Sequence, residues 1–70
     1  MRPLALARNV GRVRNLRTLA LDAETARTPD AKTLRADADR LARQTATAVR
    51  QSDKLAENVK ESLLHTLEPA

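Results

Sequence analysis

Apolar residues recur along the second half of the chain at alternating spacings of four and three. This row, which includes small polar residues, runs through Leu34, Ala38, Leu41, Thr45, Ala48, Ser52, Leu55, Val59, Ser62 and Thr66. A second row repeats every seven residues and widens the apolar face through Ala42, Val49, Ala56 and Leu63. Such a heptad pattern is typical of a helix that packs along its length against other helices. We therefore predict one long helix over about 29–67.

The first part of the chain has a shorter amphipathic pattern. Its apolar face, at helical spacing, is formed by Leu6, Val10, Val13, Leu16, Ala20 and Ala23. The pattern predicts a helix over about 4–26. Gly11 falls inside that helix, where glycine costs roughly 1 kcal/mol relative to alanine. We interpret Gly11 as room for a crossing helix, with close approach of a ligand to the backbone as the alternative.

The segment Thr28-Pro29-Asp30 marks the clearest boundary between helices. Because a residue before proline disfavours the α conformation, the first helix should end near Arg27. Threonine is a good N-cap and proline suits the first helical position. We therefore expect Thr28 and Pro29 to begin the second helix after a very tight turn.

The two predicted helices differ in length, about 35 Å against about 58 Å at 1.5 Å per residue. A hairpin of the two would leave the segment from residue 53 onward uncovered, with five large aliphatic side chains exposed. These are Leu55, Val59, Leu63, Leu64 and Leu67. A contiguous apolar surface of that kind marks a docking face. We therefore expect an all-α helical hairpin with coiled-coil-like packing that self-associates into a bundle, with a dimer as the favoured form.

A compact three-helix bundle is the alternative fold. It needs a break near 51–53, with Ser52 as the N-cap of a third helix that folds back onto the first two. No glycine or proline marks such a break, and the heptad phase continues through it. These two observations favour the hairpin. We expect a single small helical domain over 1–70, with an Arg-rich helix in 1–27 and the heptad-patterned helix in 28–68.

The apolar side chains are too few for a large core. Hydrophobic residues make up 41% of the 70 residues, but nearly all are Ala and Leu, with four Val, one Met and no aromatic residue. Small domains bury a small fraction of their surface, so this core points to stabilisation by a partner or by a second copy. We expect the helix-packing and oligomerisation contacts to be made by Leu34, Leu41, Ala48, Leu55, Val59 and Leu63.

Positive charge is concentrated at the N-terminal end. Residues 1–21 hold five arginines and no acidic residue, whereas residues 22–70 hold eight basic and nine acidic residues. The formal net charge of +4 is therefore a property of the first helix. The same Arg-, Leu- and Ala-rich composition occurs in mitochondrial presequences. Mitochondrial targeting is thus the alternative to the intracellular, cytoplasmic location that we expect.

The residue types that catalysis needs are scarce. The chain has no cysteine, one histidine and one glycine, which leaves no thiolate nucleophile, zinc-ligand spacing or glycine-rich phosphate loop. The single histidine, His65, falls at the end of the second helix, where positive charge near the last carbonyl groups is stabilising. We expect no enzymatic activity, no metal and no cofactor.

The segment RNVGRVRNLR carries the candidate binding residues. Helical spacing places Arg8, Arg12 and Asn15 on one face. Arg14 and Arg17 lie on the opposite flank of the apolar stripe. A guanidinium group matches phosphate oxygens through two parallel hydrogen bonds, and asparagine can contact a base edge. We expect these five residues to bind an acidic partner, most specifically DNA or RNA.

Two other partner classes are considered for the same segment. An acidic protein in place of nucleic acid would make the chain a protein–protein adaptor, an inhibitor or an assembly subunit. A membrane surface is not expected, because basic helices that lie on membranes usually carry Trp or Phe, and the chain has neither. No stretch approaches the roughly 20 apolar residues of a membrane-spanning helix.

Overall fold

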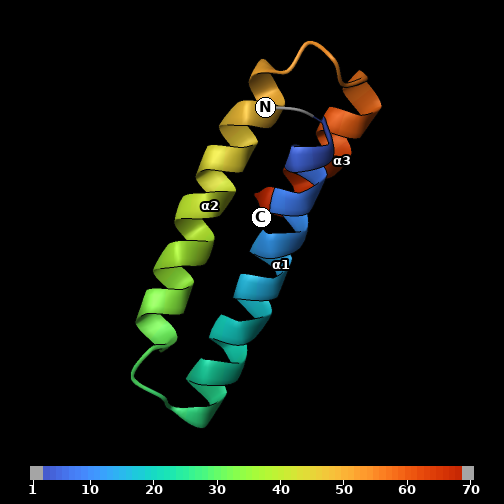
Figure 1. Ribbon diagram of the computed structural model, residues 1–70. Helices are drawn as coiled ribbons and strands as arrows, with labels where there is room; N and C mark the ends of the chain where they lie inside the picture. The colour runs from blue at the N-terminus through green and yellow to red at the C-terminus, as the bar shows by residue number, and fades with distance from the viewer. Residues whose placement is uncertain (1–2, 69–70) are drawn as a thin grey trace.

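The computed structural model describes residues 3–68, which form three α-helices and no β-strand. The helices are α1 (Pro3–Ala26), α2 (Ala31–Gln51) and α3 (Glu57–Leu67). α1 and α2 lie side by side as a hairpin, and α3 turns back at its open end to lie beside the N-terminal part of α1 (Figure 1). The all-helical class predicted from the apolar periodicity is confirmed.

The turn between α1 and α2 starts with a left-handed helix cap. α1 ends at Ala26, close to its predicted end, and Arg27 follows with a φ of 57°. The Thr28 amide donates to the Ala23 carbonyl at 3.0 Å. The Arg27 amide donates to the Glu24 carbonyl at 3.2 Å. These are the two bonds of a Schellman motif, which satisfies carbonyl groups that the helix end leaves unpaired.

α2 begins two residues later than predicted. Its first residue is Ala31 and its N-cap position is Asp30, whereas the sequence predicts Pro29 and Thr28 for these positions. The physical reason is that Thr28 belongs to the end of α1, because its hydroxyl donates to the Ala23 carbonyl at 3.3 Å. The Thr28 side chain is therefore not free to cap α2, and its carbonyl instead accepts from the Ala31 amide at 3.3 Å.

The long helix predicted over about 29–67 is interrupted. α2 ends at Gln51, and residues 52–56 leave the helical conformation before α3 begins. Ser52 ends α2 and does not cap α3, whose N-cap position is Ala56. The three helices fit the alternative fold, the three-helix bundle. The break, predicted near 51–53, covers residues 52–56, so it starts within the predicted range and ends three residues beyond it.

Burial explains why the chain turns back. The core cluster consists of Leu6, Val10, Val13, Ala42, Ala46, Val49 and Leu67. The turn brings Leu67, the last residue of α3, into this cluster, where it is 2% exposed. Burying a leucine fully is worth roughly 1.5–3 kcal/mol, and a straight helix would leave this side chain uncovered within one copy. Tertiary packing therefore overrides the local helical preference of the linker.

The predicted packing positions are largely used inside the chain. The half-buried ones that pack against the core are Leu41, Ala48, Leu55 and Leu63. Leu34 is also half-buried, and Val59 is 40% exposed. Among the predicted positions, only Val59 is thus left largely accessible on the surface of one copy.

Candidate functional site

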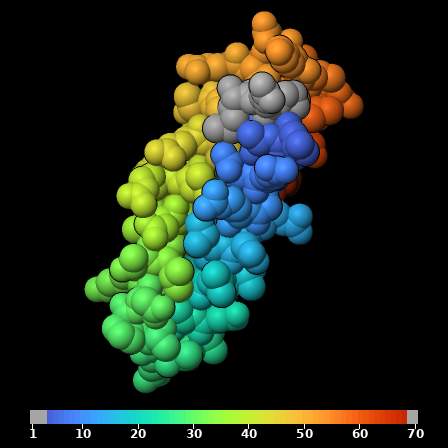
Figure 2. All heavy atoms as spheres, viewed as in Figure 1, coloured from blue at the N-terminus to red at the C-terminus, as the bar shows by residue number. Residues whose placement is uncertain are grey.

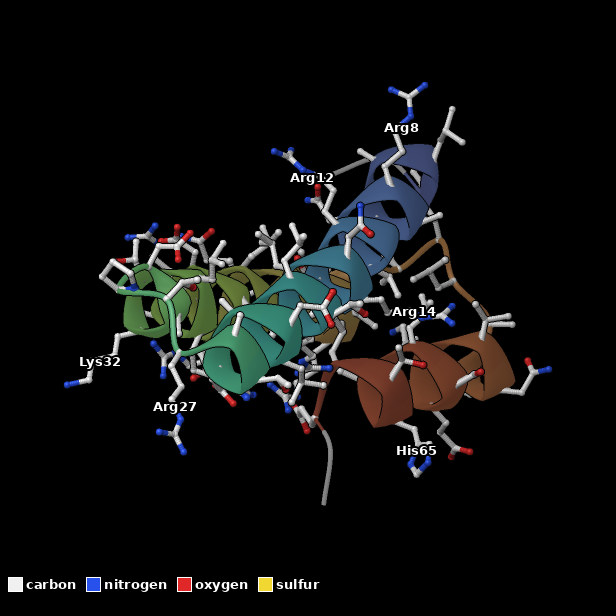
Figure 3. The ribbon with its side chains drawn as sticks, turned by 90° about the horizontal axis from the view of Figure 1, so that it is seen from below. Arg8, Arg12, Arg14, Arg27, Lys32 and His65 are labelled. Carbon is white, nitrogen blue, oxygen red and sulfur yellow. The ribbon has the colours of Figure 1, made fainter. Side chains whose placement is uncertain are left out.

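The arginines of α1 leave the helix on two sides. Figure 3 shows the Arg8 and Arg12 side chains pointing to one side of α1, with Arg14 on the side of α3. This placement agrees with the helical spacing, because residues four apart share a face. On the surface seen in Figure 2, α1 lies open along much of its length beside α2. The outer surface of α1 therefore presents arginine along both edges.

Three of these guanidinium groups form no ion pair in the part of the chain that the structure describes. Arg8, Arg12 and Arg14 are exposed, and their guanidinium groups form no ion pair or hydrogen bond within residues 3–68. By contrast, Arg35 pairs with Glu24 at 2.8 Å. Grouped cations without nearby carboxylates raise the local positive potential and attract a polyanion. We call these three residues, together with Asn15, the α1 basic surface.

A shallow hollow lies between the two edges of this surface. It has a volume of about 310 Å³ and is lined by Gly11, Arg14, Asn15 and Thr18. A Cβ atom added at Gly11 would meet no other atom within 4 Å. The interpretation of Gly11 as room for a crossing helix is therefore wrong for the helices that the structure describes. Asn15 is exposed at the hollow, and close approach of a ligand to Gly11 stays a prediction.

Arg17 differs from its neighbours because its guanidinium is already bound. The side chain is half-buried, and Nη1 donates to the Thr66 carbonyl at 2.6 Å and Nη2 to the Leu67 carbonyl at 2.5 Å. The last carbonyls of a helix have no partner within the helix, and positive charge beside them is stabilising. Arg17, which is predicted from its residue type and helical spacing to bind a partner, thus holds α3. No sequence pattern indicates this contact, because 49 and 50 residues separate the groups.

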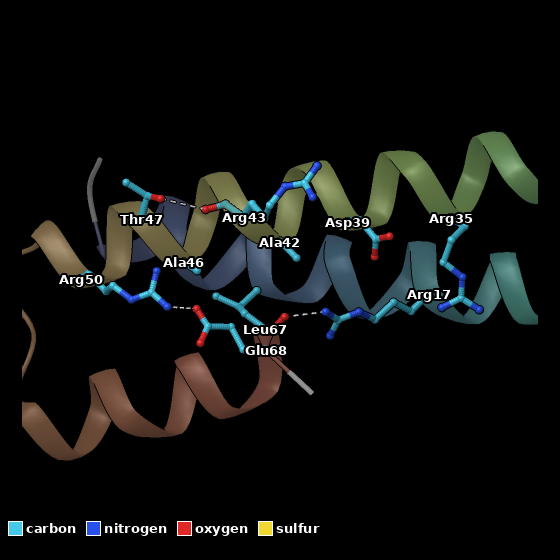
Figure 4. A pocket seen from close by; sticks show the side chains of 10 residues that line it. All are labelled: Arg17, Arg35, Asp39, Ala42, Arg43, Ala46, Thr47, Arg50, Leu67 and Glu68. Atoms are coloured by element: carbon cyan, nitrogen blue, oxygen red, sulfur yellow. Dashed lines mark hydrogen bonds and ion pairs between the residues drawn. The ribbon is translucent and has the colours of Figure 1, made fainter. Parts of the chain in front are cut away.

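A groove with a mixed lining lies where α3 ends against α1 and α2 (Figure 4). It has a volume of about 440 Å³, and its apolar floor is formed by buried Ala42, Ala46 and Leu67. The charged residues around it are Arg17, Arg35, Asp39, Arg43, Arg50 and Glu68. Sequence reasoning missed this groove because its lining comes from all three helices and depends on how α3 folds back.

The positive charges of this groove are largely matched. Arg50 forms an ion pair with Glu68, and Arg35 donates to Glu24 from Nε at 3.1 Å and from Nη2 at 2.8 Å. The hydrogen bond to Glu24 and the charge of its carboxylate raise the pKa of Arg35 above its usual value. Arg43 has no ion pair within residues 3–68. The groove is therefore a weaker anion site than the α1 basic surface.

Acidic and histidine side chains do not gather in the described part of the chain. Within residues 3–68, no three His, Cys, Asp or Glu side chains lie where they could hold a metal ion. His65 is exposed in the last turn of α3 (Figure 3). None of the described helices is both long enough and apolar enough to cross a membrane.

Comparisons with known proteins identify no relative of this chain, since no protein-family model, no curated protein and no solved structure matches it. Its function must therefore be inferred from the groups that it exposes.

Proposed function

We propose that this chain is a non-catalytic binding protein that holds nucleic acid through Arg8, Arg12 and Arg14. One observation supports this proposal above the others: the three guanidinium groups are exposed and unpaired within residues 3–68 and lie together on one helix. Among the described residues 3–68, the other arginines whose guanidinium groups form no ion pair or hydrogen bond are Arg27 and Arg43, and each lies on a different part of the fold. An external polyanion would supply the negative charge that the α1 basic surface lacks.

Phosphate suits these groups better than a single carboxylate. Duplex nucleic acid presents about one negative charge per 1.7 Å of helix axis, so one duplex supplies oxygen atoms to both edges of α1. Arginine binds phosphate through two parallel hydrogen bonds. A duplex is favoured over a single strand because the chain has no aromatic residue on which unpaired bases would stack.

The residues between the two edges suit close contact with a duplex. Gly11 has no side chain, and the hollow beside it lets a phosphate backbone approach α1 closely. Asn15 lies exposed next to this hollow. Asparagine can bind adenine through two hydrogen bonds in the major groove. In this proposal the arginines position the duplex and Asn15 contacts a base edge.

The first test is equilibrium binding to labelled duplex DNA and duplex RNA at 50 and 200 mM salt. Each phosphate contact releases condensed counterions, so affinity falls as salt rises. Three contacts predict a loss of about 40-fold across this range. Absence of binding to both duplexes at 50 mM salt would contradict the proposal.

The second test compares two triple variants with the same loss of charge. One replaces the unpaired arginines of α1, as Arg8→Gln, Arg12→Gln and Arg14→Gln. The control replaces exposed cations that lie outside α1 and form no ion pair within residues 3–68, as Lys32→Gln, Arg43→Gln and Lys54→Gln. We expect the first variant to lose binding with unchanged helical circular dichroism, and the control to keep most of its affinity. Equal losses would show that only total charge matters.

A protein partner is the second candidate, and exposed leucines on α1 favour it. Leu4, Leu19 and Leu21 are 65%, 49% and 55% exposed. Protein interfaces combine such apolar side chains with arginine. A double variant, Leu4→Gln with Leu19→Gln, separates the two candidates. It should weaken binding to a protein and leave the affinity for duplex nucleic acid unchanged.

We also propose that the chain self-associates through its heptad seam. The seam residues that one copy already uses internally are Leu41, Ala48, Leu55 and Leu63. A second copy therefore gains full access to this seam only where α3 moves away from its own hairpin. Sedimentation equilibrium over a range of concentrations tests whether a dimer forms.

A further inference from the structure

The linker between α2 and α3 is not helical, although its sequence is compatible with a helix. Residues 52–56 read Ser-Asp-Lys-Leu-Ala, contain no glycine or proline, and carry the heptad spacing from α2 into α3 without a shift of phase. In the described chain, only two linker amides donate hydrogen bonds. The Ser52 amide donates to the Val49 carbonyl at 3.3 Å, and the Lys54 amide donates to the Ser52 hydroxyl at 3.3 Å. A continuous helix would bond every amide of this segment.

Apart from Leu55, which also packs against the core cluster, the contacts that hold α3 are made outside the linker. Leu67 enters the core cluster, Arg17 donates to the last α3 carbonyls, and Arg50 pairs with Glu68. The groups that contact Leu67, the last α3 carbonyls and Glu68 all lie on α1 and α2. A hairpin therefore provides the same seat for α3 whether that α3 belongs to its own chain or to another copy.

We propose that a second copy of this chain docks by exchanging α3, with residues 52–56 straightened into one helix over 31–67 in each copy. This inference rests on the self-association proposed above and specifies its contact. The straight helix would be about 55 Å long and would carry α3 beyond the end of its own hairpin. With two copies placed end to end about a two-fold axis, each α3 reaches the seat that the other has left.

The direction of the helices is compatible with this exchange. In one copy, α3 turns back and runs against the direction of α2 (Figure 1). In the exchanged dimer, the straightened α3 follows its own α2 and therefore runs against the α2 of the other copy. Each seat thus receives α3 in the orientation seen here, and the two interfaces are identical by symmetry. Exchange of an identical element is a low-cost route to a dimer.

Concentration sets the balance between closed monomer and exchanged dimer. A short linker gives α3 an effective concentration on the order of 1 mM at its own hairpin. We therefore expect the dimer to form as the protein concentration approaches this value. If straightening of the linker is favourable, the dimer should form at lower concentrations. Sedimentation equilibrium from about 0.01 to a few mM covers this range.

A cross-linking experiment identifies which α3 occupies each seat. The chain has no cysteine, so Arg50→Cys with Glu68→Cys places two unique thiols where the ion pair lies. A short bismaleimide joins them within one chain in the closed monomer and between two chains in the exchanged dimer. Denaturing electrophoresis should show single chains from dilute protein and covalent dimers from the concentrated dimer fraction. A dimer fraction that yields only single chains would leave self-association standing and overturn the exchange of α3.

Substitutions at Ala56 test the straightened linker directly. Ala56 has a φ of −66°, which proline accepts, and its amide donates no hydrogen bond within residues 3–68. Proline inside a continuous helix lowers the equilibrium constant for straightening the linker by about 10²-fold in each copy. Because both copies of the dimer are straightened, Ala56→Pro should weaken dimerisation by about 10⁴-fold. Ala56→Gly should weaken it by about 30-fold, with no proline ring to disturb folding. Circular dichroism serves as the control that tests whether each variant keeps its helices.

The outcomes separate the two proposals. Concentration-dependent dimers with cross-links between chains, weakened in the order Ala, Gly and Pro at position 56, would support the exchange. A dimer that forms equally well with Ala56→Pro would overturn the exchange and leave self-association standing. No dimer at a few mM would overturn both.

Discussion

Arg17 of α1 donates hydrogen bonds from both terminal nitrogens of its guanidinium group to the carbonyl oxygens of Thr66 and Leu67, the last two residues of α3. α3 is also held by the burial of the Leu67 side chain and by the ion pair of Arg50 with Glu68. That ion pair is about half exposed on both sides, and such pairs contribute little to stability. Arg17 is therefore the main polar attachment of α3 to the hairpin.

Replacing this attachment should loosen α3. We expect Arg17→Gln to lower the free energy of unfolding by about 1–2 kcal/mol, because charged hydrogen bonds to half-buried carbonyls are lost. Urea unfolding followed by circular dichroism measures this change, and amide hydrogen exchange should show the largest loss of protection in α3. Arg14→Gln is the control, since its guanidinium has no partner within residues 3–68. Similar effects of the two substitutions would contradict the attachment.

Thr45 predicts a gain in stability. It is fully buried, and its hydroxyl oxygen has no hydrogen-bond partner within residues 3–68. Burial of an unpaired hydroxyl is costly, so Thr45→Val should raise the free energy of unfolding by about 1 kcal/mol. Thr47→Val is the matched control, because Thr47 is exposed and donates to the Arg43 carbonyl at 3.0 Å. A loss of stability at Thr45→Val would show that the hydroxyl is satisfied in solution.

A substitution at Arg27, at the end of α1, should also raise the free energy of unfolding. Its φ of 57° lies in the left-handed region, which costs an L-residue roughly 1–2 kcal/mol and costs glycine nothing. After the extra chain entropy of glycine in the unfolded state, Arg27→Gly should raise the free energy of unfolding by about 0.5–1 kcal/mol. Arg27→Ala removes the same guanidinium but keeps the strain, and it should show no such gain in thermal or urea unfolding.

Gly11 predicts opposite effects on stability and on binding. Because a Cβ there meets no atom within 4 Å, Gly11→Ala should raise the free energy of unfolding by about 1 kcal/mol through helix propensity alone. In the proposed complex the same methyl group stands between the α1 backbone and the phosphates. We therefore expect the affinity for duplex nucleic acid to fall while the melting temperature rises. An unchanged affinity would remove Gly11 from the proposed interface.

The helical elements were more accessible to sequence reasoning than their connections. The apolar spacing and Pro29 place the first helix at about 4–26, and the structure has Pro3–Ala26. The heptad row, however, continues through Ser52 and says nothing about where Leu67 will be buried. That choice depends on contacts across the chain, which override local preference. The predicted N-cap role of Thr28 is wrong for a similar reason, because its hydroxyl donates to the Ala23 carbonyl of α1.

The candidate site divides in the same way. Helical spacing is sufficient to put Arg8 and Arg12 on one edge of α1 and Arg14 on the other, and the structure shows this arrangement. Helical spacing does not distinguish Arg14 from Arg17, because both lie on the same flank of α1. Only the fold shows that α3 supplies hydrogen-bond acceptors to Arg17 and none to Arg14 within residues 3–68. Nucleic-acid binding itself stays a proposal that the binding experiments test.

The burial of Leu67 under α1 and α2 also has a kinetic consequence. A ligand that needs the apolar side of the hairpin must wait until α3 has detached, so its binding includes a first-order opening step. At high ligand concentration the observed association rate should then reach a plateau equal to the opening rate. A ligand of the outer α1 surface meets no such barrier, and its rate should keep rising linearly with concentration.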